Sequence, residues 1–188
     1  MAHPMKRLLS YVGRAWSFVT SQLPGEHFVI SKTHDVPEFL EKSKRELAQH
    51  GKLACEILDI EGCYPTMPKD AIRLGLRDAA NEMRRLGHLG VWVPKVATSK
   101  PCSWKPVGRH AKVWLSFEAM NEIMEFSLDH AYVKMPDGSL GRLVWQKLGI
   151  PMGDPISPGM TIGACAWMES RRCAAVLRTP PFQATPLS

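Results

Sequence analysis

Apolar side chains recur every three or four residues in three stretches of the chain, the spacing that gathers them on one face of an α-helix. These stretches are residues 7–23, 69–86 and 117–130. Pro24-Gly25 ends the first stretch and Gly87 ends the second. Ser116, a favoured N-cap residue, precedes the third. We therefore expect three amphipathic helices with buried apolar faces, and we expect the arginines of 69–86 to be solvated.

Start and stop signals predict two further helices. Asp35 can cap a helix that runs from Val36 to about His50, with Gly51 as its stop. Ser157 followed by Pro158 is a strong helix start. The small residues that follow, up to a helix end near Leu177, permit close packing against a neighbour.

Period-two alternation over residues 55–60 predicts a β-strand, and residues 27–30 are a second, shorter candidate. Asp59 lies near the carboxyl end of the first strand, just before Gly62. Two interpretations of Asp59 stay open at this point. It closes the strand as a turn former, or it reaches a ligand in a cleft from a rigidly packed strand.

A loop with two glycines, Gly149-Ile150-Pro151-Met152-Gly153, precedes the last predicted helix. Glycine permits backbone conformations and close approaches that a side chain would forbid. Because this loop leads into a helix N-terminus, it is suited to lie against a flat or anionic ligand.

Together these two stretches resemble a known family. Asp59, with Tyr64 five residues later, resembles motif A of reverse transcriptases. The loop at 149–153, followed by Ile156-Ser157-Pro158, resembles their motif B.

The likeness is greatest to Penelope-like elements and their telomerase-related kin, in which a hairpin and a Tyr or Trp precede the Gln of motif B. In this chain the hairpin would span residues 131–146 and turn at Asp137-Gly138, with Trp145 before Gln146. The resemblance runs from about residue 8 to about residue 175.

The resemblance implies an α/β (α+β) fold, in which a palm-like antiparallel sheet is backed by helices and accompanied by part of a helical fingers subdomain. Residues 1–178 would be a partial reverse transcriptase domain. Within it, residues 1–53 would be fingers-like helices and residues 54–178 palm-like, with a basic insertion at 87–113. Residues 179–188 show no periodicity and are expected to be a disordered tail.

By resemblance, the chemistry would be two-metal nucleotidyl transfer, in which two Mg²⁺ ions hold the attacking and leaving oxygens. Asp59 would be a bridging ligand, helped by the main-chain oxygen of Ile60. Tyr64 would support the sugar of a deoxynucleoside triphosphate and leave no space for a 2′-hydroxyl, which favours DNA synthesis over RNA synthesis. The other nucleotide-binding residues would be Gln146, Gly149, Pro151, Gly153 and Ser157.

Residues 87–112 interleave basic and aromatic side chains and contain no acidic residue. The candidate nucleic-acid-binding residues here are Trp92, Lys95, Lys100, Trp104, Lys105, Arg109 and Lys112. Basic groups mixed with aromatic rings suit phosphate neutralisation and base stacking, here on an RNA template or an RNA–DNA hybrid. The alternative is a surface insertion whose tryptophans pack against the body of the protein.

The chain departs from the family pattern in three ways. It contains no adjacent pair of aspartates, so motif C is missing, as is the thumb expected in a full-length protein. In the family, the basic fingers residues that hold the triphosphate lie before the first helix, and we expect this chain to start after them. Asp154 stands where Penelope-like relatives usually carry Ser, and would place a negative charge beside incoming phosphates. We therefore expect little or no polymerase activity from these residues alone.

Three hypotheses for the function remain. The first is a fragment of an RNA-directed DNA polymerase from a retroelement. The second is a non-catalytic nucleic-acid-binding module or a decayed retroelement relic. The third is a globular protein with chance motif matches. An aromatic-x-Asp-Asp turn encoded shortly downstream would favour the enzyme over the module.

Composition narrows the choice only slightly. The net charge of +6 suits an anionic partner. Five cysteines, without a C-x-x-C pair, indicate neither a zinc site nor a disulfide framework, which favours a reducing, intracellular compartment. An active retroelement product would be expected in the nucleus. No apolar run approaches the roughly 20 residues of a membrane span, so no membrane partner is expected.

Overall fold

The computed structural model describes residues 5–24, 35–48, 62–96, 101–106, 112–135 and 141–178. It contains both helices and strands, as expected for an α+β protein. The predicted strands at 27–30 and 55–60 and the predicted tail at 179–188 lie outside the described residues.

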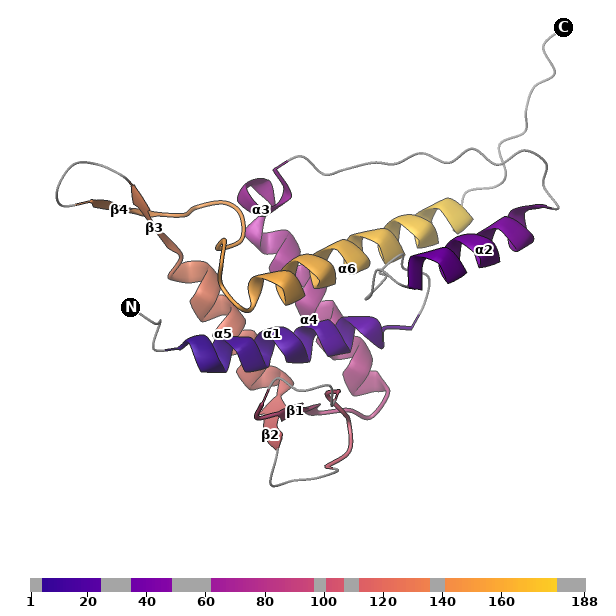
Figure 1. The fold of residues 1–188 in the computed structure, drawn as a ribbon, viewed down its shortest axis with the longest axis horizontal. Helices are drawn as coiled ribbons and strands as arrows, with labels where there is room; N and C mark the ends of the chain where they lie inside the picture. Colours follow the sequence, from indigo (N-terminus) through magenta and orange to yellow (C-terminus); the bar gives the residue numbers. More distant parts are fainter. Residues whose placement is uncertain are drawn as a thin grey trace, which may run out of the picture.

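All five predicted helices are confirmed to within a few residues (Figure 1). They are α1 (Lys6–Ser21), α2 (Val36–Leu47), α4 (Lys69–Arg85), α5 (Phe117–Asp129) and α6 (Ser157–Arg178). The predicted cap of α5 forms, since the Ser116 hydroxyl accepts the Ala119 N–H at 3.2 Å. A short helix that the periodicity did not reveal, α3 (Cys63–Thr66), lies just before α4.

The strands of the described residues form two separate antiparallel pairs. One pair is β1 (Gly90–Pro94) with β2 (Lys112–Ser116), and the other is β3 (Tyr132–Met135) with β4 (Arg142–Trp145). The second pair confirms the hairpin predicted at 131–146. The first was not predicted, because the basic and proline-rich composition of 87–113 obscured the alternation that buries Val91 and Val93.

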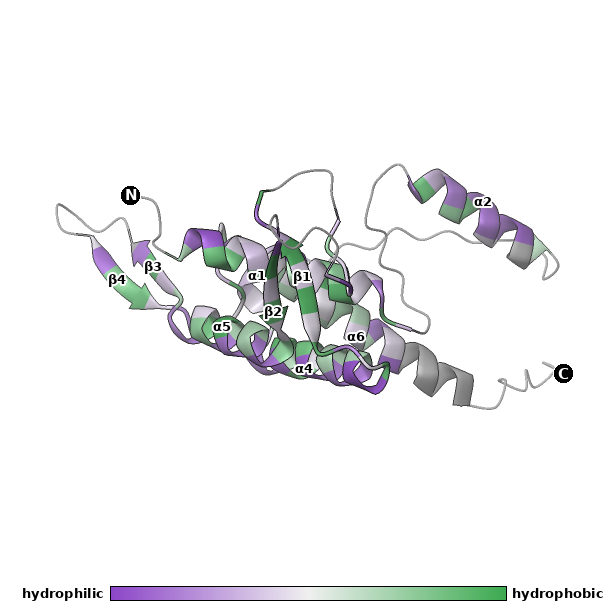
Figure 2. Cartoon of the chain, turned by 90° about the horizontal axis from the view of Figure 1, so that it is seen from below, coloured by the Kyte–Doolittle hydropathy of each residue, from purple (hydrophilic) through white to green (hydrophobic). Residues whose placement is uncertain are grey.

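The core is built from α1, α4, α5 and α6, with the β1–β2 pair against α1. Trp16 on α1, Leu76 on α4, Met124 on α5 and Met160 on α6 are all fully buried. The β3–β4 hairpin extends away from this body in two perpendicular views (Figures 1 and 2). The hairpin is therefore attached to the core mainly through its base.

Two helices of the core approach each other at the level of the backbone. A Cβ added to Gly159 on α6 would lie 2.7 Å from the Gly13 carbonyl oxygen on α1 and 3.1 Å from Cβ of Trp16. A Cβ added to Gly13 would overlap the Pro155 carbonyl. The start of α6 is thus fixed on α1, and with it the loop that precedes α6.

The arginines of α4 are not simply solvated, as the sequence had suggested. Arg73 binds Glu125 at 2.6 Å and Asp129 at 2.7 Å, both on α5, and Arg77 binds Glu125 at 2.7 Å. Arg84 binds Glu118 at 2.5 Å. The more exposed of these pairs, at Arg77 and Arg84, are each worth only about 0–1 kcal/mol. All of them, including the partly buried pair of Arg73 with Glu125, neutralise positive charge that would otherwise attract phosphates.

Replacing Gly159 with alanine should lower the free energy of unfolding by about 1–3 kcal/mol, because the new methyl group meets a main-chain oxygen that cannot move aside. Chemical denaturation measures the change. Met168→Ala, at an exposed position of the same helix, is the matched control and should stay within about 0.5 kcal/mol of the wild type. An unchanged midpoint for Gly159→Ala would contradict the backbone contact between α1 and α6.

Candidate functional site

The short helix α3 and the loop at 149–153 lie against each other, although they are far apart in the sequence. The Ile150 N–H donates to the Tyr64 carbonyl at 2.7 Å, and the Gly149 N–H donates to the Met67 carbonyl at 3.0 Å. Gly62, in the left-handed region at φ 62°, starts α3 and turns the chain toward this contact. The structure therefore joins the two segments in which the sequence resembles the reverse transcriptase motifs A and B.

Gly149 is the residue on which this approach depends. Its φ is 79°, and a Cβ at this position would lie 2.6 Å from the carbonyl carbon of Pro65 and overlap the Tyr64 carbonyl oxygen. Any other residue would be strained and would push α3 away from the loop. Gly153 also has a positive φ of 85°, but a Cβ there would meet nothing within 4 Å. At position 153, glycine is therefore favoured by the backbone conformation alone, because no neighbouring atom lies close enough to exclude a side chain.

The loop is also held by side chains at its two ends. Nε2 of Gln146 donates to the Ile150 carbonyl at 3.3 Å, and the Ser157 hydroxyl donates to the Pro151 carbonyl at 2.5 Å. The Gln146 N–H donates to the Ala131 carbonyl at 2.8 Å, where the hairpin begins. Both polar side chains thus bind main-chain oxygens of the loop.

Lys69 binds the main chain just before the loop. The sequence pattern did not indicate this role of Lys69. Its side chain is largely buried, with 7% of the residue surface exposed. Its ammonium group donates to the carbonyls of Leu128 and Gln146, and lies 5.3 Å from the centre of the Trp145 ring. The first residue of α4 therefore connects the end of α5 with the end of β4.

Burial shapes the ionisation of Lys69. Desolvation lowers the pKa of its ammonium group from the ordinary value of 10.5; the nearby charge of Asp129 opposes this effect and that of Arg73 adds to it. Two carbonyl acceptors compensate the buried donor group only in part.

Asp154 has a structural role in this chain. One carboxylate oxygen accepts the Ile156 N–H at 3.2 Å, and the other accepts the Ser127 hydroxyl at 2.8 Å. The carboxylate is therefore directed toward α5 and tied to it. This placement differs from the expectation that Asp154 would face incoming phosphates.

The described residues do not provide a magnesium site by themselves. No group of three or more His, Cys, Asp or Glu side chains among them is arranged to hold a metal ion. Asp154, the acidic residue next to the loop, already has both carboxylate oxygens occupied. The two candidate metal ligands, Asp59 and Ile60, lie outside the described residues.

The aromatic residues of the basic segment mostly serve the fold. The Trp104 ring stacks on His88 at 4.1 Å between ring centres, tilts against Phe18 at 4.8 Å and meets the edge of Phe117 at 6.4 Å. Trp92 lies 5.3 Å from Trp114. For Trp104 this placement matches the alternative of a tryptophan packed against the body.

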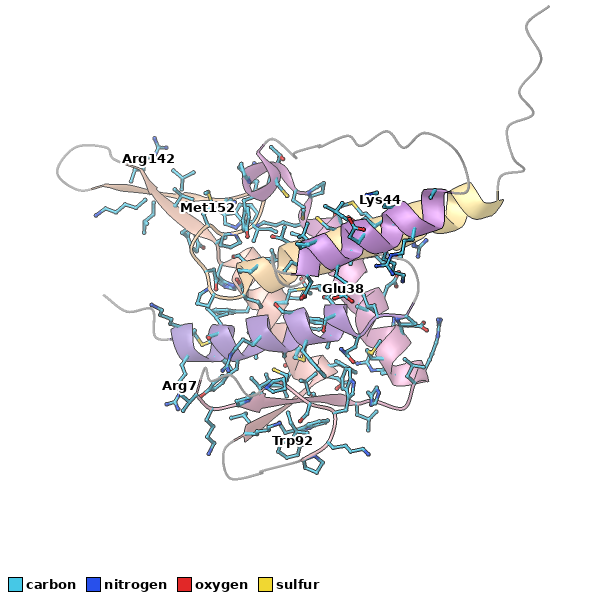
Figure 3. All side chains as sticks on the ribbon, turned by 45° about the vertical axis from the view of Figure 1, so that its right-hand side comes forward. Arg7, Glu38, Lys44, Trp92, Arg142 and Met152 are labelled. Carbon is cyan, nitrogen blue, oxygen red and sulfur yellow. The ribbon has the colours of Figure 1, made fainter. Side chains whose placement is uncertain are left out.

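The basic side chains of this segment have different surroundings: some are hydrogen-bonded within the fold and others are exposed to solvent. Nζ of Lys112 donates to the Ser103 hydroxyl at 2.7 Å, while Lys95 and Lys105 are exposed. Lys100 and Arg109 lie outside the described residues. Trp92 in β1 and Met152 in the loop lie on opposite sides of α1 (Figure 3). The strand that carries Trp92 is therefore not part of the contact between Tyr64 and Gly149.

Replacing Lys69 with methionine should lower the free energy of unfolding by about 1–3 kcal/mol at neutral pH, because two buried carbonyls lose their donor. The loss should grow with pH. Since the pKa of Lys69 is lower in the folded chain than 10.5, the unfolded chain binds more protons between these two values, and the contribution of Lys69 rises in that window. The neutral amine keeps N–H donors for both carbonyls.

Denaturation of both proteins at several pH values, from neutral to just below 10.5, measures this difference. Lys44→Met, at an exposed position of α2, is the matched control and should stay within about 0.5 kcal/mol of the wild type at neutral pH. A gap between wild type and Lys69→Met that narrows as the pH rises would contradict the sign of the shift.

No family model matches this chain, and no curated protein or solved structure is significantly similar to it. Within the described ranges, no helix has the length and apolar character needed to cross a membrane. The geometry of the chain's own residues is therefore the guide to what the protein does.

Proposed function

We propose that this chain is part of an RNA-directed DNA polymerase that uses two-metal nucleotidyl transfer. The observation that carries the proposal is the meeting of Tyr64 and the Gly149–Gly153 loop through two main-chain hydrogen bonds. Two motifs that resemble the same family at separate places in the sequence are adjacent in space. A chance pair of matches would have no reason to converge in this way.

In this proposal the described residues position the nucleotide. Tyr64 is partly buried and packs against the core, and in this proposal the exposed part of its ring would support a sugar and exclude a 2′-hydroxyl. The loop, fixed by Gln146 and Ser157, presents its backbone to the base pair being formed. Asp59, five residues before Tyr64, would supply the carboxylate for Mg²⁺. The proposal also assigns residues 54–178 to a palm-like region and residues 1–53 to part of the fingers.

The partners proposed are an RNA template, an RNA–DNA hybrid and a deoxynucleoside triphosphate. The net charge of +6 supports an anionic partner. A retroelement product of this kind would act in the nucleus. Because the sequence has no adjacent pair of aspartates, we expect these residues to bind substrates rather than to complete the reaction alone. A non-catalytic nucleic-acid-binding module is the second candidate, and the tests below distinguish the two.

The sugar preference of nucleotide binding tests the role of Tyr64. With an RNA–DNA hybrid and Mg²⁺ present, we expect the wild type to bind a deoxynucleotide about tenfold more tightly than the ribonucleotide, which is about 1.4 kcal/mol. Tyr64→Val should bring the two affinities together, because the smaller side chain leaves space for the 2′-hydroxyl. Equilibrium binding of fluorescent nucleotides measures both affinities.

Phe126→Val is the control for replacing an aromatic ring with valine, since Phe126 is half-exposed on the outer side of α5. It should leave the sugar preference unchanged. A wild-type protein that binds the hybrid but no nucleotide would support the module instead of the polymerase. An unaltered preference in Tyr64→Val would remove the proposed role of that ring.

Binding of an RNA–DNA hybrid should depend strongly on salt and only weakly on sequence. Each phosphate that the protein neutralises should reduce the affinity about three- to fourfold when monovalent salt rises from about 50 to 200 mM. Fluorescence anisotropy with two hybrids of unrelated sequence measures both properties. Affinity that does not change over this range would contradict a phosphate-dominated interface.

A further inference from the structure

We propose that the β3–β4 hairpin is a stacking surface for single-stranded nucleic acid, with Trp145 and Tyr132 as its two platforms. The proposal rests on the proposed function, in that it takes nucleic acid as the partner, and adds a location that the sequence did not indicate. The candidates named from the sequence belong to the basic segment at 87–112, of which Trp92 lies on the other side of α1 from Met152 (Figure 3).

Tyr132 and Trp145 are directly opposite each other in the antiparallel register of the hairpin. Side chains at opposite positions of such a pair point to the same face of the sheet. Both rings are open to solvent, with 59% of Tyr132 and 48% of Trp145 exposed. Two neighbouring aromatic rings on one face suit the stacking of unpaired bases, which every base can provide regardless of sequence.

Trp145 is fixed in place despite its exposure. Its indole N–H donates to the Asp129 carbonyl at 2.9 Å. The ammonium group of Lys69, held by two carbonyls, lies 5.3 Å from the ring centre. A ring that is already ordered loses little conformational entropy when a ligand binds. These two contacts orient the Trp145 ring, which is half-exposed and is not part of the hydrophobic core.

The exposed charge on the ring face of the hairpin favours an anionic partner. Lys134 is exposed two residues after Tyr132, on the same face as the two rings, and Lys147 is exposed just after the hairpin. Arg142 is also exposed, toward the outer end of the hairpin (Figure 3), but on its opposite face. None of the described residues between 131 and 153 is acidic.

A cavity of about 350 Å³ beside Tyr132 extends this surface toward the loop, and it is also lined by Lys6, His130 and Met152. The lining carries both positive and negative charge, because Asp154 contributes to it as well as Lys6. The Asp154 carboxylate is already hydrogen-bonded to the Ser127 hydroxyl and the Ile156 N–H. A single nucleic-acid strand stacked on Tyr132 would have the Lys6 ammonium group beside it, across the cavity.

A second copy of the chain fits this surface less well. The hairpin also exposes Val133, Leu143 and Val144, which would suit an apolar contact. Self-association would however bring Lys134, Arg142 and Lys147 of two copies close together, and like charges repel. A single strand of nucleic acid satisfies the cations and the rings at once, whereas a paired duplex keeps its bases stacked internally.

Fluorescence anisotropy of labelled oligo(dT) and oligo(rU), about 20 nucleotides long, tests the proposal with the whole chain. Trp145→Leu and Tyr132→Ala should each weaken binding about five- to a hundredfold, the range of one lost stacking contact. Tyr132→Phe should bind like the wild type, because it keeps the ring. Trp114→Leu, at an exposed tryptophan of β2 with 40% exposure, is the matched control and should bind normally.

The cations and the fold are checked separately. Lys134→Ala and Lys147→Ala should each reduce the slope of log affinity against log salt by about 0.7, whereas Arg142→Ala, on the opposite face of the hairpin, should change it little. Circular dichroism confirms folding of each variant, and Tyr132→Ala keeps the test valid if Trp145→Leu unfolds. Normal single-strand binding by Tyr132→Ala, or an equal loss in Trp114→Leu, would overturn the proposal. A concentration-dependent dimer in sedimentation that Tyr132→Ala abolishes would overturn it in favour of a second copy.

Failure here can be separated from failure of the polymerase proposal. If Tyr132→Ala binds single strands normally but Tyr64→Val still equalises the sugar preference, the hairpin surface is wrong and the nucleotide site stands. If the wild type shows no sugar preference while Tyr132→Ala loses single-strand binding, the hairpin surface stands without the polymerase.

Discussion

Two main-chain hydrogen bonds, from Gly149 and Ile150 to the carbonyls of Met67 and Tyr64, determine the shape of the candidate site. The helix α3 has only four residues and buries none of them, so it cannot be stable by itself. Cys63 and Tyr64 pack only partly against the core, so α3 also depends on the loop for partners, and the loop in turn depends on Gly149 for the space to approach. Met67, which is buried, anchors the junction between α3 and α4.

The loop is held from three further directions, each by a different element. Asp154 ties its end to α5 through Ser127, and the contact of Gly159 with Gly13 fixes the following helix on α1. Lys69 binds the Gln146 carbonyl at its beginning. A loop with a free glycine at each end would ordinarily be mobile. Here the contacts around it limit that freedom, which is what a surface that positions a nucleotide requires.

The helices could be predicted because each has a local signal: an apolar stripe, an N-cap or a terminating glycine. The β3–β4 hairpin could be predicted only through the family resemblance. Strands β1 and β2 could not, because a long basic connection separates them and their pairing is non-local. Lys69 was missed for a related reason. A lysine at the start of a helix is normally exposed, and its two acceptors, Leu128 and Gln146, come from distant parts of the chain.

Net positive charge does not by itself locate a nucleic-acid surface, because the sequence does not show which cations are already paired. The structure assigns several of them to the fold. Arg73, Arg77 and Arg84 bind acids of α5, and Lys69 is buried between two carbonyls.

The exposed cations of the hairpin have a different environment. Lys134, Arg142 and Lys147 are accompanied by no acid among the described residues 131–153. Lys134 lies on the same face of the hairpin as Trp145, and the ammonium group of Lys69 lies 5.3 Å from the centre of that ring. The buried lysine thus connects the two proposed functions of this region: it binds the backbone at the start of the loop, and it orients the ring on which a single strand would stack.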